Sequence, residues 1–347
     1  MFDELISQLR QGAALSAAQI GLAVSHLIEE QVPAEAKADF LTALASKGET
    51  ASEIAAFAHE LREKSIPPPL DAETRQREIL DVCGTGGDRL NTFNISTTVA
   101  LVAASAEVTV AKHGNRAITS QSGSADVLEA LGIPVDLTPK QAADSLRDHH
   151  FAFFFAPKYH PAYKHIGQAR KICADRGQRT IFNFLGPLLN PARPSAQLVG
   201  VPNPKLCEPI AQVLQLLGVR RGMVVSGCAG EATLDELSTL GENTIAEFYK
   251  DRGFTMSVMS PDGFPLLRAT LADLQGGDRE ANARIVHALL EGKERGPKRD
   301  AVLLNGGAAL FVAGKTRSLL EGWDMAAELI DSGKSSAKLK ALSTVRR

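Results

Sequence analysis

The stretch from residue 81 to residue 132 constrains the fold of this chain more than any other. It begins within an apolar run, Ile79–Cys83, that has the length and composition of a buried strand. Three glycines follow within residues 84–87, and glycine lets a backbone turn sharply and approach a ligand closely. Residues 94–97, Asn-Ile-Ser-Thr, then provide N-cap side chains before an apolar-periodic run. A strand, a glycine turn and a helix are therefore predicted in succession.

The second half of the stretch repeats this pattern. A strand candidate, Val108–Ala111, leads into the basic loop Lys112–Arg116, and Ser122–Ser124 opens another helix that ends at Gly132. Helix N-termini offer free N–H groups to anions, so the pattern predicts a βαβα unit that binds a ligand with more than one phosphate. The glycine turn is neither a Walker A motif nor a G-x-G-x-x-G fingerprint, and by itself it is equally typical of an ordinary βα turn.

The rest of the chain predicts an α/β fold with a small all-helical domain. Residues 1–66 read as helices with N-cap signals at Ser16 and at the Thr50/Glu53 capping box. A proline-rich break and a polar run, residues 67–77, read as a linker. Residues 78–347 alternate strands and helices, which predicts a central, mostly parallel sheet flanked by helices.

Composition excludes several classes of function. A net charge of −2 gives no bulk electrostatic attraction to nucleic acid. No long uncharged apolar run is present, so we expect no membrane span, and the acidic N-terminus lacks a signal-peptide pattern. Four cysteines without paired spacing fit a reducing compartment, so we expect a cytoplasmic protein.

Three further segments carry expectations. Asp235 and Glu236 follow a predicted loop, residues 226–233, and adjacent carboxylates suit a hard divalent cation, although such a pair is by itself more often solvated surface. Arg170 lies in a basic segment that suits an anionic ligand or, equally, a solvated helix face. The mildly basic C-terminal tail, residues 334–347, is expected to be frayed.

Taken together, these motifs resemble those of the anthranilate phosphoribosyltransferase family. The similarity covers nearly the whole chain, with several motifs in register. They are Gly84-Thr85-Gly86-Gly87-Asp88, Asn94-Ile95-Ser96-Thr97, Lys112-His113-Gly114-Asn115-Arg116, Ser122-Gly123-Ser124-Ala125-Asp126, Phe182 to Pro191, Asp235-Glu236 and Leu329 to Lys334. Two departures stand out: residues 226–233 lack the family's frequent His-Gly, and Phe184 replaces a more usual leucine.

The resemblance implies a cytoplasmic homodimer that joins anthranilate to the ribose of 5-phosphoribosyl 1-diphosphate (PRPP) in tryptophan biosynthesis. It also implies two Mg²⁺ per subunit, dimer contacts on the helical domain, and a fold related to pyrimidine nucleoside phosphorylases. Segments from about residues 160–195 would return to the helical domain. Neither nucleic acid nor a membrane is implied as a partner.

By position, the resemblance also implies the roles of individual residues. Anthranilate would contact Gly84, Asn115 and Arg170, whose guanidinium suits a carboxylate. Metal ligands would be Ser96, Asp235 and Glu236. His113 is a weak candidate for a base, and a hydrogen-bonding role suits it better. The residues implied for PRPP are Gly84, Gly87, Asp88, Thr92, Asn94, Ile95, Ser96, Thr97, Lys112, His113, Gly114, Asn115, Arg116, Ala117, Ile118, Thr119, Ser120 and Ser124.

Two alternatives remain open from the sequence. A pyrimidine nucleoside phosphorylase would use the same architecture with inorganic phosphate and a nucleoside, although the Asn-Ile-Ser-Thr and Asp-Glu motifs favour PRPP. A non-catalytic relative that binds nucleic acid is disfavoured by the net charge of −2.

Overall fold

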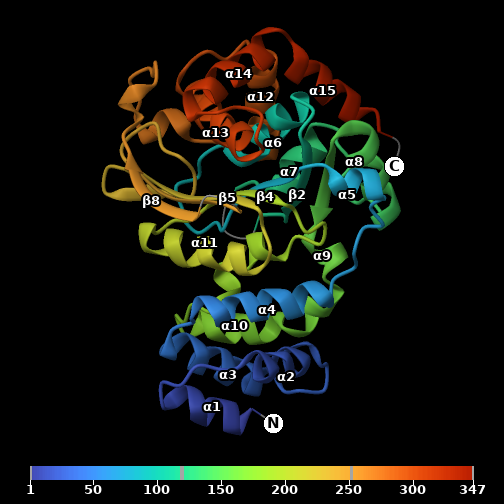
Figure 1. The fold of residues 1–347 in the computed structure, drawn as a ribbon, viewed down its shortest axis with the longest axis vertical. Coiled ribbons are helices and arrows are strands. Elements are labelled where there is room, and N and C mark those ends of the chain that lie inside the picture. Colours follow the sequence, from blue (N-terminus) through green and yellow to red (C-terminus); the bar gives the residue numbers. More distant parts are fainter. Residues whose placement is uncertain (1, 118–120, 251–252, 346–347) are drawn as a thin grey trace.

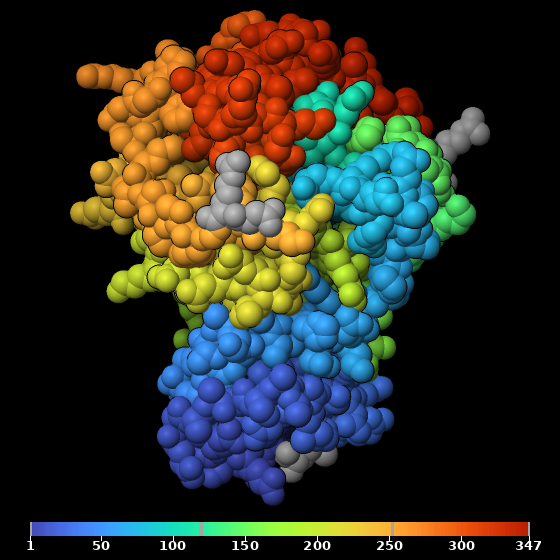
Figure 2. Space-filling view, viewed as in Figure 1, coloured from blue at the N-terminus to red at the C-terminus, as the bar shows by residue number. Residues whose placement is uncertain are grey.

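A computed structural model describes residues 2–117, 121–250 and 253–345, and it has two parts. A helical bundle at the N-terminal end lies below a larger α/β part (Figure 1). In the space-filling view the bundle is the narrower lower end of the molecule (Figure 2). The predicted fold class, a small helical domain with a larger α/β domain, is confirmed.

The bundle forms from short amphipathic helices with well-defined starts. Ser16 and Thr50 each accept a hydrogen bond in the capping boxes that begin α2 and α4, as the sequence predicts. The helix α10 (Gly167–Asp175) comes from far along the chain and packs against α3. The bundle's other helices are α1 (Asp3–Arg10), α2 (Ala17–Ile28), α3 (Ala34–Lys47) and α4 (Ala51–Glu63).

The α/β part is built on one sheet with the strand order β3-β2-β1-β4-β5-β7-β8, and β6 pairs with β5. The strands from β3 to β5 in this order are parallel, whereas β6, β7 and β8 join antiparallel. Their bounds are β1 (Ile79–Gly84), β2 (Thr109–Gly114), β3 (Phe151–Phe155), β4 (Ala196–Gly200), β5 (Arg221–Ala229), β6 (Ala232–Leu234), β7 (Asn243–Tyr249) and β8 (Gly253–Met259).

Helices cover both faces of this sheet. One face packs against α6, α12, α13 and α14, whereas α11 lies on the other face, between the sheet and the bundle (Figure 1). The helices of this part are α5 (Ala72–Gln76), α6 (Ile95–Ser105), α7 (Ser124–Ala130), α8 (Pro139–His149), α9 (Ala156–Tyr159), α11 (Cys207–Leu216), α12 (Arg279–Leu290), α13 (Pro297–Val312), α14 (Leu319–Asp331) and α15 (Lys334–Ser343). Among the described residues, no helix combines the length and the apolar character that crossing a membrane requires.

Two local expectations are wrong. Most of the C-terminal tail is not frayed: residues 334–343 form α15, which packs on α6 and buries Leu339 and Leu342, and residues 346–347 lie outside the described residues. Those two leucines lie three positions apart on one helix face, and that spacing is enough to anchor the segment. The expected loop at 226–233 is mostly a β-hairpin, in which Cys228 pairs with Thr233 across a turn at Gly230.

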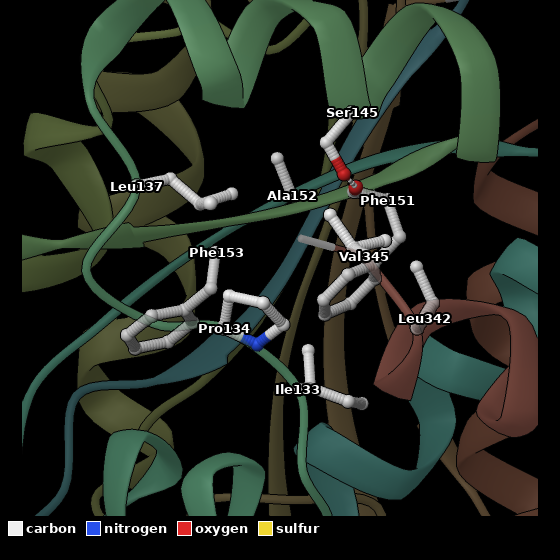
Figure 3. Close-up of a pocket in the computed structure, with 9 residues that line it drawn as sticks. All are labelled: Ile133, Pro134, Leu137, Ser145, Phe151, Ala152, Phe153, Leu342 and Val345. Atoms are coloured by element: carbon white, nitrogen blue, oxygen red, sulfur yellow. Dashed lines mark hydrogen bonds between the residues drawn. The ribbon is translucent and has the colours of Figure 1, made fainter. Parts of the chain in front are cut away.

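The small cavity beside α15 is a packing void. It encloses about 10 Å³ and is lined mainly by apolar side chains, including Ile133, Phe151 and Leu342 (Figure 3). The hydroxyl of Ser145, on its rim, donates to the Phe151 carbonyl oxygen over 2.6 Å. A void of this size holds at most one water molecule, so the functional site lies elsewhere.

Candidate active site

The carboxyl ends of the parallel strands bring most of the predicted phosphate-binding residues to one edge of the sheet. Gly84 ends β1, Gly114 ends β2, and β1 pairs with β2 in parallel, so both chains leave the sheet on the same side. After β1 the backbone turns through Gly86 and Gly87, whose φ angles of 74° and 92° lie in the left-handed region that favours glycine.

The remaining predicted residues fall into four groups. Asp88, Thr92 and Asn94 lie on the loop after β1; Ile95, Ser96 and Thr97 form the first turn of α6; Lys112, His113, Gly114, Asn115, Arg116 and Ala117 end β2 and continue beyond it; and Ser124 starts α7. The predicted residues Ile118, Thr119 and Ser120 lie outside the described residues.

The acidic pair follows β6 and lies against this edge. The Gly86 backbone N–H donates to Asp235 Oδ2 over 2.7 Å, and the Ser96 N–H donates to Glu236 Oε1 over 3.1 Å. Both donors belong to the predicted phosphate-binding segments, although they lie some 140 residues away in sequence. The structure therefore brings the predicted metal ligands Ser96, Asp235 and Glu236 together.

The charge of the acidic pair is poorly compensated by the protein. Burial, followed by the charge of Asp88, raises the pKa of Asp235; burial, followed by the charge of Asp235, raises the pKa of Glu236. Such a concentration of negative charge is what a divalent cation would neutralise, so these residues fit magnesium. Within residues 2–117, 121–250 and 253–345, no three His, Cys, Asp or Glu side chains are grouped as metal ligands. A magnesium ion here would therefore take further oxygens from Ser96, water and a phosphate.

Glycines make room for the acidic pair. A Cβ atom at Gly84 would overlap the Asp235 carboxylate, and one at Gly200 would overlap the Asp235 carbonyl oxygen. Likewise, a Cβ at Gly114 would overlap the hydroxyl of Ser124. The glycine at each of these strand ends is thus required by close packing rather than by a positive φ.

Lys112 is the buried cation of the site. Its side chain is 1% exposed, and Nζ donates to the Val82 carbonyl oxygen over 2.6 Å and to Ser96 Oγ over 3.4 Å. These contacts hold the ammonium group at the first turn of α6. A positive charge and free helix N–H groups at the same place favour an anionic ligand.

Arg116 is oriented differently from Lys112. Its guanidinium forms ion pairs with Asp126 at 3.0 Å and with Glu129 at 2.6 Å, and it lies over the Phe155 ring. Asn115 is exposed, and its side-chain oxygen accepts the Arg116 N–H over 2.8 Å.

A row of rings connects the end of β2 with the predicted anthranilate residue Arg170. His113 lies edge-on to His160 at 5.3 Å between centroids, and His160 stacks on Tyr163 at 5.1 Å. Tyr163 meets Phe182 edge-on at 5.9 Å, and the Arg170 guanidinium lies 5.5 Å from the centroid of Phe182. The sequence did not assign a role to His160 or Tyr163.

Several polar atoms along this row are buried without a protein partner. Among the described residues, His113 Nε2, the Tyr163 hydroxyl and one terminal nitrogen of Arg62 have no hydrogen-bond partner. Burial lowers the pKa of His113 to about 3, so its ring is neutral at physiological pH. Buried polar groups are normally paired, so these atoms are available to a ligand or to water.

Two protein-family models match this chain and identify its class of protein. The model of the glycosyl transferase family's a/b domain matches residues 76–336, and that of its helical bundle domain matches residues 3–65. The two matches together span most of the chain, so the fold and the site are those of a glycosyl transferase of this two-domain type.

Individual relatives narrow this class. An anthranilate phosphoribosyltransferase from Petrotoga mobilis is 44% identical over 342 residues, covering 99% of this chain and 96% of the relative. The crystal structure of the enzyme from Thermus thermophilus matches with a TM-score of 0.88 at 40% identity, covering 98% of each chain. The structure of the Saccharomyces cerevisiae enzyme in complex with PRPP and Mg matches with a TM-score of 0.85 at 27% identity, covering 99% of this chain and 98% of that one. The chain belongs to the anthranilate phosphoribosyltransferase family.

The close packing at Gly200 predicts a specific mutational effect. Gly200→Ala should lower the free energy of unfolding by about 1–3 kcal/mol and weaken Mn²⁺ binding, because the added Cβ must displace Asp235. Urea denaturation and calorimetric titration with Mn²⁺ measure the two effects. Gly263→Ala is the matched control, since a Cβ there meets nothing within 4 Å. Equal behaviour of the two variants would contradict the packing argument.

The buried histidines predict an acid-sensitive fold. Burial lowers the pKa of His160 to about 4, whereas an unfolded chain titrates at roughly 6.5. Below the unfolded pKa the unfolded state binds more protons, so the free energy of unfolding falls as pH falls toward 4. Replacing His160 by Asn should therefore make the loss between pH 7.5 and pH 5 smaller by about 2 kcal/mol. The exposed His59→Asn variant is the control, and an unchanged pH dependence in His160→Asn would refute the assignment.

Proposed function

We propose that this protein transfers the 5-phosphoribosyl group of PRPP to the amino group of anthranilate and releases diphosphate, a step of tryptophan biosynthesis. The observation that carries the proposal is the continuity of the site. The acidic pair Asp235–Glu236 and the buried Lys112 lie at one end of the site. The row of rings that begins at His113 leads from there to Arg170. The solved yeast relatives are described in complex with PRPP and Mg and with 4-fluoroanthranilate, which supports a two-substrate site.

The donor half of the proposed site would bind PRPP at the sheet edge. Lys112 and the N–H groups in the first turn of α6 would hold the diphosphate, and the loops 84–97 and 112–124 would surround the rest of the molecule. Asp235, Glu236 and Ser96 would hold magnesium, which when bound neutralises charge on the diphosphate. We propose two ions per subunit, as the resemblance to the family implies, with Ser96 and the acidic pair as the protein's ligands.

The acceptor half would bind anthranilate along the row of rings. Arg170 would pair with its carboxylate, Asn115 and Gly84 would contribute contacts, and the flat ring would lie beside Tyr163 and His160. His113 Nε2 is a free acceptor at the other end of this row, where it can accept a hydrogen bond from the amine.

The chemistry follows from charge and orientation. The C1–O bond to diphosphate breaks and a C1–N bond forms, while the amine loses one proton. Negative charge develops on the departing diphosphate, where the fixed charge of Lys112 and the α6 N–H groups stabilise it. The amine is a neutral nucleophile, so orientation by Arg170 and His113 contributes more than a strong base would.

We further propose three features of the assembly and its setting. The domains divide as residues 1–66, linker 67–77 and residues 78–347. The protein forms a homodimer through the helical domain, as the resemblance to the family implies. A cytoplasmic location fits the cysteines, all four of which are free in the described structure.

The transfer reaction is tested by loss of anthranilate fluorescence in the presence of PRPP and Mg²⁺. We expect turnover that requires both PRPP and Mg²⁺. Phosphorolysis of thymidine with inorganic phosphate, in place of transfer, would instead identify a pyrimidine nucleoside phosphorylase. Salt-dependent DNA binding without any turnover would identify a non-catalytic relative.

Arg170→Ala should raise the anthranilate KM by about tenfold or more and leave the PRPP KM within about twofold. A guanidinium–carboxylate pair contributes roughly 1.5–3 kcal/mol, and only one substrate makes it. Steady-state kinetics with each substrate varied in turn measure the split. Lys171→Ala removes a neighbouring exposed cation and should leave both constants unchanged. A parallel rise of both KM values in Arg170→Ala would argue against the carboxylate contact.

A further inference from the structure

A buried carboxylate, which is not among the residues predicted to contact PRPP or anthranilate, lies next to the site. Asp81 is on β1 and is fully buried. One of its oxygens accepts the His113 backbone N–H over 3.2 Å, and the other accepts the Asn190 side-chain amide over 2.8 Å. Burial raises the pKa of Asp81 to about 6, so the group is ionised at neutral pH.

Asn190 extends this contact to a second segment. Its amide also donates to the Ala111 carbonyl oxygen over 2.7 Å, and its side-chain oxygen accepts the Ala192 N–H over 2.9 Å. All the polar atoms of this buried amide are therefore used, and they hold the segment that follows the turn at Gly186 against β1 and β2.

The same turn holds the ring of His113. The Gly186 carbonyl oxygen lies 3.1 Å from His113 Nδ1, and because a carbonyl can only accept, Nδ1 carries the proton. Nε2 is then the unprotonated nitrogen, and it is the atom left buried without a partner among the described residues. Asp81 thus contacts the backbone N–H of His113 directly, and it is linked to the His113 ring through Asn190 and the turn that begins at Gly186.

We propose that Asp81 is a positioning residue for the acceptor half of the reaction, through its contacts with the His113 N–H and with Asn190. The clamp fixes the Nδ1-protonated tautomer, so that the Nε2 lone pair faces the amine of anthranilate. This inference rests on the proposed function for its kinetic consequence, although the tautomer itself does not.

The charge of Asp81 distinguishes a positioning role in catalysis from a purely structural role. The charge of Asp81 also acts on the buried Lys112, so removing it leaves more of the lysine charge available to phosphates. Asp81→Asn should therefore lower kcat/KM for anthranilate by about tenfold or more while the PRPP KM stays the same or falls. Thr109→Val is the matched control, because it removes a buried polar group at the far end of β2, next to His150. That variant should show no such split.

A charge swap tests the clamp itself. Asn190→Asp alone places two carboxylates face to face and should lower kcat/KM for anthranilate. The double variant Asp81→Asn with Asn190→Asp restores an amide–carboxylate pair and should recover part of that loss. A double variant no better than the worse single variant would overturn the proposal, as would a parallel rise of both KM values in Asp81→Asn.

The tautomer is measured independently of activity. The ¹⁵N NMR spectrum of histidine-labelled wild-type protein should show His113 neutral and protonated on Nδ1, with the signal assigned from a His113→Gln spectrum. A wild-type His113 protonated on Nε2 would overturn the proposal even if Asp81→Asn fails to fold. Absence of transfer by the wild-type protein would refute the proposed function alone, because this spectrum would still test the clamp.

Discussion

The structure depends on how it accommodates two adjacent carboxylates at the carboxyl edge of a parallel sheet. Burial raises the electrostatic cost of both carboxylates, the charge of Asp235 adds to that of Glu236, and the charge of Asp88 adds to that of Asp235. Backbone N–H groups of Gly86 and Ser96 donate to the pair, and no basic side chain among the described residues forms an ion pair with it. The strand-end glycines beside the pair exist because any Cβ there would collide with Asp235. A pair of carboxylates kept in such an environment makes physical sense as half of a cation site that a ligand completes.

The two halves of the site come from different parts of the fold. The donor half is built from strand ends and helix starts, so its geometry is rigid and follows from the parallel sheet. The acceptor half is a row of rings that begins on β2 and continues on the segments 160–163 and 181–183. Arg170, at its far end, belongs to α10, which packs on the bundle. His113 belongs to both, since it lies next to the last residue of β2 and also begins the row of rings. Positioning His113 therefore couples the two halves, which is why Asp81 matters although it is buried beneath them.

Local patterns in the sequence predict the donor half well and the acceptor half poorly. The glycine turn, the starts of α6 and α7 and the strand alternation are short-range signals, and the structure places these elements as expected. The expected capping by side chains is wrong, because neither the Asn94 side chain at the start of α6 nor Gly123 at the start of α7 makes a side-chain cap hydrogen bond. The hairpin at 226–233 was missed because its glycines and polar residues look like a loop, whereas cross-strand pairing decides its structure. His160, Tyr163 and Asn190 have no periodicity around them, and their contacts with His113, Phe182 and Asp81 join segments far apart in sequence. Only the resemblance to a family, and not any local pattern, assigned Arg170 to an acceptor.

Anomalous diffraction from crystals grown with PRPP and Mn²⁺ tests the central claim most directly. Manganese replaces magnesium with the same preference for oxygen ligands. We predict an anomalous peak within coordination distance of a carboxylate oxygen of Asp235 or Glu236, with phosphate oxygens of PRPP bound to the same manganese ion. Bound PRPP with every manganese peak remote from both carboxylates would contradict it.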